Sequence, residues 1–265
     1  MMLSSYARVI CSTAKEGFIY KIASFFSIVN RLIEISIYLF VWKAVYSSSG
    51  SIEGIEFSNM VIYYVITFSI SHIMYFGTNE EMGEKIRNGT ITMELLYPIS
   101  YMDYYFSYKL GNTLRQVVLV VIPTFIITTL LFSVNININL INFGQFIIIL
   151  MLAIVNVFFI EFIFGMVAFV TNSLWGLQTL KNSLIMIFSG AIAPITLFPQ
   201  FMQVIMEKLP FVDFIYSPAN ALIGNVNFIE FVNIIFRESI WAIILFIIAN
   251  ILYKKLIKKV TIFGG

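Results

Sequence analysis

The sequence predicts an all-α integral membrane protein with six transmembrane helices. The 265-residue chain is 60% hydrophobic and only 11% charged, whereas a soluble domain carries about 25% charged residues. Several apolar runs approach or exceed the roughly 20 residues that a helix needs to cross a bilayer. A transmembrane β-barrel would instead show alternating segments of about ten residues. We therefore expect residues 1–265 to form a single transmembrane domain embedded in lipid.

The first seventeen residues predict an amphipathic helix that lies in the membrane interface. Its apolar side chains share one face, formed by Leu3, Tyr6, Ala7, Ile10 and Ala14. No apolar core precedes the first span, so the pattern of a cleavable signal is absent. A frayed cytosolic tail is the alternative interpretation.

The first span, roughly Phe18 to Val45, carries a polar stripe at steps of three or four residues. Arg31 lies near mid-depth, where an ionised side chain facing lipid is costly. We therefore expect Arg31 to face protein or a water-filled cavity, with Glu34 as its nearest candidate partner. The pair would either fix packing or take part in handling a substrate.

Three further spans follow, with boundaries at roughly Phe57–Phe76, Tyr101–Phe132 and Gln145–Val170. His72, near the inner end of the second span, predicts a hydrogen-bonded interface residue rather than a ligand. Pro123 should kink the third span.

An isolated carboxyl group, Glu161, lies in the apolar body of the fourth span. It must be protonated or paired, and either Arg31 or Arg115 would serve as its partner.

The one long polar segment, residues 78–100, connects the second and third spans. Thr78 and Glu81 fit a capping box, Glu81 and Lys85 are i,i+4 partners, and Gly89 fits a C-terminal cap. This pattern predicts a short helix on which Met82 and Ile86 form an apolar ridge among charges. Such a ridge outside the bilayer indicates docking onto another protein; an ordinary solvated loop is the alternative.

The last third of the chain predicts two spans with an irregular segment between them. A polar turn at residues 171–183 leads into the fifth span, roughly Leu184 to Phe198. Residues 199–230 then hold two half-length apolar helices, Phe201–Leu209 and Ser217–Gly224, which indicate outer re-entrant or interfacial elements. The sixth span runs from roughly Phe231 to Tyr253.

The distribution of basic residues predicts the orientation. One side of the membrane would hold Arg8, Lys15, Lys85, Arg87, Lys109, Lys181, Lys254, Lys255, Lys258 and Lys259. Lys208 alone lies in the loops of the other side. By the positive-inside rule, both termini and the 78–100 segment are cytoplasmic.

The sequence offers no recognisable catalytic machinery. It contains no GxxxxGK[ST], HExxH or GxSxG motif, so we expect no ATP hydrolysis by this chain. The lone Cys11 excludes an intrachain disulfide. We expect no metal, no cofactor and no nucleic-acid partner.

Two sets of residues resemble small bacterial ABC exporter permeases of type 2. The first is Gly89-Thr90-Ile91 followed by Leu95-Leu96-Tyr97-Pro98-Ile99-Ser100, which looks like that family's cytoplasmic signature. The second signature runs from the fifth span through the outer helices and comprises Ser189-Gly190, Pro194, Phe198-Pro199, Leu209-Pro210-Phe211, Pro218 and Gly224. The six-span layout matches along the whole chain.

The resemblance implies an exporter permease of the cell membrane that works with separate cytosolic ATPase subunits and a second permease, as a homodimer or heterodimer. The coupling helix would lie at residues 80–88, between spans two and three. The ATPase-coupling residues would be Glu81, Met82, Lys85, Ile86, Arg87, Gly89 and Thr90. The substrate would be apolar or amphipathic, such as a drug, peptide or lipid, and Arg31, Glu34 and Glu161 are candidate residues of its pathway.

Two alternatives stay open. A secondary transporter or channel would use Arg31, Glu34 and Glu161 as an ion pathway, but such proteins often show internal repeats and residues 1–132 show none with 133–265. The second alternative is a membrane scaffold without transport activity.

Overall fold

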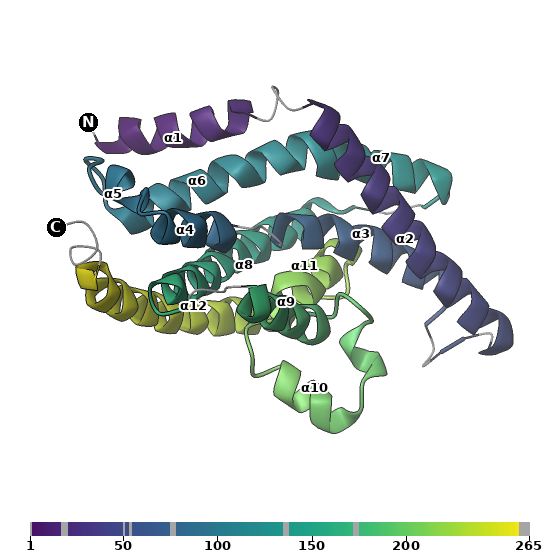
Figure 1. The fold of residues 1–265 in the computed structure, drawn as a ribbon. Coiled ribbons are helices and arrows are strands. Elements are labelled where there is room, and N and C mark those ends of the chain that lie inside the picture. Colours follow the sequence, from purple (N-terminus) through teal and green to yellow (C-terminus); the bar gives the residue numbers. More distant parts are fainter. Residues whose placement is uncertain are drawn as a thin grey trace.

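The computed structural model describes residues 2–16, 21–49, 51–52, 55–74, 78–134, 138–171 and 175–259. The regular elements of these residues are helices, apart from one isolated β-bridge between Ile52 and Ile55. The all-α class is therefore confirmed for the described part of the chain (Figure 1).

Among the described residues, five helices are long and apolar enough to cross a membrane, and they coincide with predicted spans one to four and six. The first two are α2 (Lys21–Ser49) and α3 (Phe57–Met74). The others are the continuous α6 (Tyr101–Gln116), π-helix (Val117–Val121) and α7 (Ile122–Leu131), then α8 (Leu140–Met166) and α12 (Phe228–Leu256).

At Pro123, where we expected a kink, the third long helix has a π-helical turn just before the proline. Proline has no N–H to donate to the carbonyl four residues earlier, and its ring crowds that carbonyl. The helix widens over Val117–Val121, immediately before α7 begins. A π-turn of this kind absorbs a local mismatch within a continuous helix.

The region of the predicted fifth span is built differently. Helix α9 (Trp175–Phe188) has 14 residues, so it is about 21 Å long, shorter than the hydrocarbon core of a bilayer. It ends because Gly190 adopts a left-handed conformation (φ +78°) and Pro194 follows. Trp175–Ser183, predicted as part of a polar turn, belongs to this helix.

Helices α10 (Gln200–Met206) and α11 (Val212–Ile223) replace the two predicted half-length helices. Helix α11 begins five residues before Ser217, so Pro218 lies inside it, and it ends at Gly224 as predicted (φ +96°). It packs against α8 and α3 and contributes Phe214 and Ile215 to the main core.

The two ends of the molecule carry different elements. Helices α4 (Thr78–Arg87) and α5 (Ile91–Glu94) lie at one end with the start of α6 and the end of α12, on the left of Figure 1. The C-terminal end of α2 lies at the other end, on the right of Figure 1.

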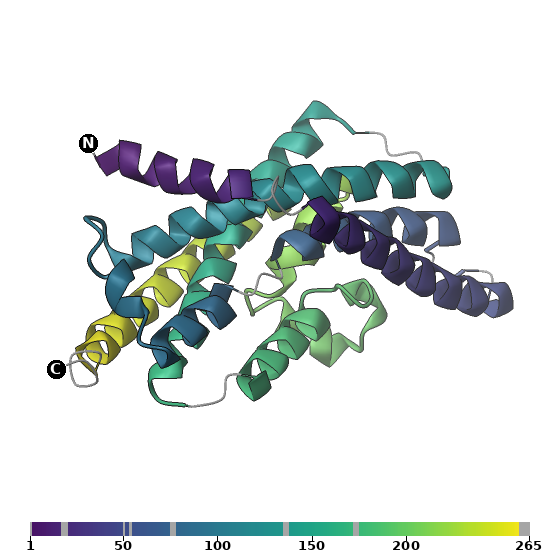
Figure 2. The same ribbon diagram turned by 45° about the horizontal axis from the view of Figure 1, so that its top comes forward.

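Helix α1 (Met2–Glu16) runs along α6, as Figure 1 and Figure 2 both show. A Cβ on Gly111 of α6 would lie 2.6 Å from the carbonyl oxygen of Ile10. This close approach requires glycine at position 111.

Candidate functional site

The polar segment between α3 and α6 folds into a helix held by charges. Lys85 of α4 donates from Nζ to Glu81 Oε1 at 2.7 Å and to Glu94 Oε1 at 2.7 Å. The predicted Glu81–Lys85 pair is therefore confirmed, and Glu94 is an additional partner that ties α5 to α4. Gly89 has the predicted left-handed conformation (φ +71°) after α4. The predicted capping box depends on the Thr78 side chain, which is outside the described part of the chain.

Lys85 also lies above aromatic rings of α6. Its Nζ is 5.7 Å from the ring centre of Tyr105 and 5.9 Å from that of Tyr108, within the range of cation–π attraction. Burial alone lowers the pKa of Lys85, but the hydrogen bonds that it donates to Glu81 and Glu94 outweigh burial, so the pKa is raised above its usual value. Lys85 therefore stays charged and fixes α4 on the first turns of α6.

The apolar ridge of α4 faces the inside of the chain, which differs from the expectation that it is exposed. Met82 is only 1% exposed, and its Sδ would lie 2.5 Å from a Cβ added to Gly165 of α8. Ile86 packs against the same apolar cluster, which includes Tyr101, Phe162 and Met166. The reason is that the end of α8 offers a notch, at Gly165, that a long thioether side chain fills.

Most of the exposed surface of this segment comes from residues after Ile86, with Glu84 as an exposed residue before it. Of the predicted coupling residues, Arg87, Gly89 and Thr90 are exposed, while Glu81 and Lys85 are half-buried. Met93 is 68% exposed and Leu96 is 80% exposed. These two large apolar side chains lie beside the predicted coupling residues, and only the motif resemblance around Leu96 hinted at them.

The predicted Arg31–Glu34 pair is present in the middle of α2. Arg31 Nη1 lies 2.6 Å from Glu34 Oε2, and Arg31 Nε donates to His72 Nδ1 of α3 at 3.0 Å. Because arginine can only donate, Nδ1 must accept. The ring proton of His72 is therefore on Nε2, which faces Gln116 Oε1 of α6 at 2.9 Å. One hydrogen-bonded chain thus joins three helices.

A cavity of about 360 Å³ lies beside this chain of hydrogen bonds, between α2, α3 and α9. Arg31 and Glu34 contribute to its wall, so the expectation that Arg31 faces protein or a cavity agrees with the structure. The other lining residues are Tyr38, Phe68, Ser71, Thr179, Asn182, Ser183, Met186 and Ala191.

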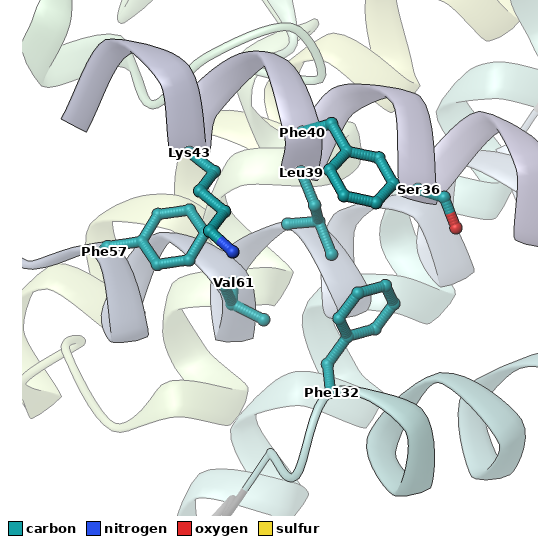
Figure 3. A pocket seen from close by; sticks show the side chains of 7 residues that line it. All are labelled: Ser36, Leu39, Phe40, Lys43, Phe57, Val61 and Phe132. Carbon is teal, nitrogen blue, oxygen red and sulfur yellow. The ribbon is translucent and has the colours of Figure 1, made fainter. Parts of the chain in front are cut away.

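A second, smaller cavity of about 160 Å³ lies further along α2, against α3 and Phe132. Its lining is mostly apolar, and Figure 3 shows the ammonium end of Lys43 beside the ring of Phe57. The hydroxyl of Ser36 donates to its own helix, to the carbonyl of Leu32 at 2.7 Å. This cavity offers an apolar surface with one cation.

Glu161 is paired with Lys109, so the expectation that Arg31 or Arg115 is its partner is wrong. Lys109 Nζ lies 3.1 Å from Glu161 Oε2, and the two side chains are 1% and 3% exposed. Arg31 bonds Glu34 and His72, and Arg115 bonds Asn112. From sequence, Lys109 was counted among the basic residues of the cytoplasmic side, because α6 was not expected to bring this residue against α8.

The structure also contains an ion pair that was not predicted. Arg237 of α12 donates to both carboxylate oxygens of Asp213 on α11, with Nε to Oδ2 at 2.6 Å. The hydroxyl of Ser217 donates to Oδ1 at 2.6 Å. The signal in the sequence was a basic residue inside the apolar sixth span, since such residues require a partner.

Within the described residues, no group of three or more His, Cys, Asp or Glu side chains could hold a metal ion. The arrangement instead comprises a helix at one end of the bundle, clamped by charges, and a partly polar cavity between long apolar helices.

These features define a multi-pass α-helical membrane protein with a charge-clamped helix between its second and third long helices. The family model described as ABC-2 family transporter protein matches residues 32–264, and the chain belongs to this family. The match confirms the resemblance drawn from the two motifs. Members of this family lack ATPase domains and work with an ATPase partner. A search of curated proteins finds no match.

Proposed function

We propose that this chain is the permease subunit of an ATP-driven exporter, in which cytosolic ATPase subunits drive alternating access of a path between two permeases. The family assignment supports a transporter. The observation that carries the coupling mechanism is the seating of Met82 against Gly165.

Energetic coupling requires a contact that differs between two states of the transporter. Helix α4 packs on α8 and on the 3₁₀ turn that follows it, and Lys85 clamps α4 to α5 and to the start of α6. A displacement of α4 by a bound ATPase would therefore be transmitted to α6 and α8 together. Met82 and Ile86 then act as the internal link, rather than as the contact with the ATPase.

The contact with the ATPase would come from the exposed part of the segment. Arg87, Gly89 and Thr90 adjoin the exposed apolar side chains of Met93 and Leu96. An apolar contact surrounded by polar groups is the usual composition of a protein interface. This assignment keeps the predicted coupling segment but moves its apolar contact from Met82 to Met93 and Leu96.

The proposed orientation places both termini and α4 in the cytoplasm. Lys109 and Lys181 are buried and so drop out of the count of loop charges. The remaining basic residues still favour the α4 side: Arg8, Lys15, Lys85, Arg87 and the four lysines at 254–259. Lys208 remains the one basic residue assigned to the loops on the opposite side of the membrane.

The proposed substrate pathway includes the cavity lined by Arg31 and Glu34. Glu161 is buried against Lys109, so we assign it a structural role. The ion-pathway alternative required Arg31, Glu34 and Glu161 to act together. Arg31 pairs with Glu34, whereas Glu161 pairs with Lys109. The three residues therefore do not form one site, which favours the exporter over an ion pathway.

Two measurements test the proposal. A tagged permease purified from its own membranes should retain an ATPase, identified by its nucleotide-binding motifs, and ATP hydrolysis by the complex should respond to transported substrate. In a Cys11-free background, a cysteine at Gln203 should react with an impermeant reagent on intact cells, and a cysteine at Asn88 should not. A purified permease without ATPase, or equal labelling at both positions, would contradict the proposal.

A further inference from the structure

We propose that the cavity between α2, α3 and α9 binds an organic cation with an apolar body. The inference rests on the exporter function proposed above and names the class of molecule that its pathway accepts. At about 360 Å³ the cavity is at the lower end of the range for small-molecule sites. The charge preference follows from which polar groups of the lining are already engaged.

The carboxylate is the more accessible member of the Arg31–Glu34 pair. The side chain of Glu34 is 45% exposed, and that of Arg31 is 21% exposed. Arg31 is held on two sides, by Glu34 through Nη1 and by His72 through Nε. The ion pair uses Oε2 of Glu34, so Oε1 is left as an acceptor toward a ligand.

Two hydroxyl groups of the lining can offer acceptors only. Ser71 donates its hydroxyl proton to the carbonyl of Thr67 at 2.7 Å. Thr179 donates to the carbonyl of Trp175 at 2.9 Å. A hydroxyl that has donated its proton presents lone pairs to anything else that approaches. Both oxygens therefore add negative potential to the cavity.

The aromatic lining also favours a cation. Tyr38 and Phe68 have ring centres 5.0 Å apart in an edge-to-face arrangement. Aromatic rings attract a positive charge within about 6 Å of their centres, and they supply apolar contact area to the body of the ligand. Of the donors in the lining, Tyr38, Asn182 and Ser183 are neutral, and Arg31 is balanced by Glu34. The acceptors and aromatic rings of the lining thus outweigh its donors, and the cavity favours a positively charged ligand.

Tetraphenylphosphonium and tetraphenylborate provide a direct test, because they have nearly the same size and shape and opposite charge. Binding is measured on the purified permease in an uncharged sugar detergent by isothermal titration, with protein-free micelles subtracted. We expect tetraphenylphosphonium to bind more tightly, and Glu34→Gln to weaken its binding about tenfold. Glu34→Gln should leave tetraphenylborate binding unchanged or stronger.

Three further variants make the test specific. Thr179→Val removes an acceptor from an exposed position without changing side-chain volume, and it should weaken the cation about twofold to threefold. Glu207→Gln alters an exposed carboxylate after α10 and should have no effect. Lys43→Gln tests whether the borate binds in the apolar cavity of Figure 3 instead; reduced borate binding in this variant, with cation binding unchanged, supports the proposal.

Equal affinity of the Lys43→Gln variant for the two ions, or cation binding unaffected by both Glu34→Gln and Thr179→Val, would overturn the inference. For this assay the permease is produced without its ATPase, so the outcome is independent of the proposed coupling. If the permease associates with its ATPase but does not prefer the cation over the anion, only the proposed class of ligand is refuted. Cation binding by a permease that associates with no ATPase would refute only the exporter function.

Discussion

The buried Lys109–Glu161 pair gives the sharpest prediction about stability. The two side chains join α6 to α8 at 3.1 Å and are almost completely removed from solvent. Removing one member of such a pair leaves a buried charge without its partner, which typically costs about 3–5 kcal/mol. Lys181 of α9 is also buried and is close enough to Lys109 to repel it. The two single substitutions should therefore differ.

Lys109→Met leaves Glu161 buried without this partner, so we expect a loss of about 3 kcal/mol in the free energy of unfolding, the lower end of that range. Glu161→Leu leaves two buried cations together and should cost more, about 5 kcal/mol, the upper end of the range for breaking a buried pair. The double variant should be more stable than Glu161→Leu alone, with a coupling energy of about 2 kcal/mol.

Unfolding in mixed micelles, followed by tryptophan fluorescence, measures these differences, and Lys208→Met is a matched control at an exposed position that should change stability by less than about 0.5 kcal/mol. Additive effects of the two substitutions, or a loss from Lys109→Met no larger than that from Lys208→Met, would refute the buried pair and the packing of α6 on α8.

Three further predictions concern the other contacts. Gly165→Val should displace Met82 and destabilise the protein by about 1–3 kcal/mol while weakening the response of ATP hydrolysis to substrate; normal coupling in a stable Gly165→Val variant would contradict the role of α4 as an internal link. Arg31→Leu should reduce assembly or transport, with partial recovery of assembly when Glu34 is also replaced by Gln; unchanged expression, assembly and transport would show that the pair is peripheral. Arg237→Leu leaves Asp213 buried without its bidentate partner and should lower the thermal transition of the purified protein, whereas an unchanged transition would argue against the α11–α12 contact.

The sequence predicted the long helices well, because continuous apolar runs leave few alternatives to a membrane-spanning helix. It also predicted the Arg31–Glu34 and Glu81–Lys85 pairs, since three-residue and four-residue spacing on one helix places side chains together. Gly89 and Gly224 end their helices as expected for residues that tolerate a positive φ.

Contacts between residues on different helices could not be predicted from the spacing of residues along one helix. Met82 has the spacing of an exposed ridge, but whether a ridge faces a partner or its own chain depends on the notch at Gly165, 83 positions away. Glu161 required a cation, but local spacing does not select Lys109 over Arg31 or Arg115. The end of α9 at Phe188 depends on Gly190 and Pro194 interrupting an apolar run that composition alone would continue.

The central claim is that the segment from α4 to Leu96 docks the ATPase through exposed residues and transmits motion through buried ones. Pull-down of the ATPase that co-purifies with the wild-type permease tests this most directly, using Met93→Asp combined with Leu96→Asp beside Met82→Asp. The exposed pair of substitutions should abolish association and leave the thermal stability of the permease intact, because both side chains lie on the surface. Met82→Asp should instead destabilise the permease itself, since it places a charge against Gly165. Full ATPase association by the Met93→Asp, Leu96→Asp variant would contradict the account.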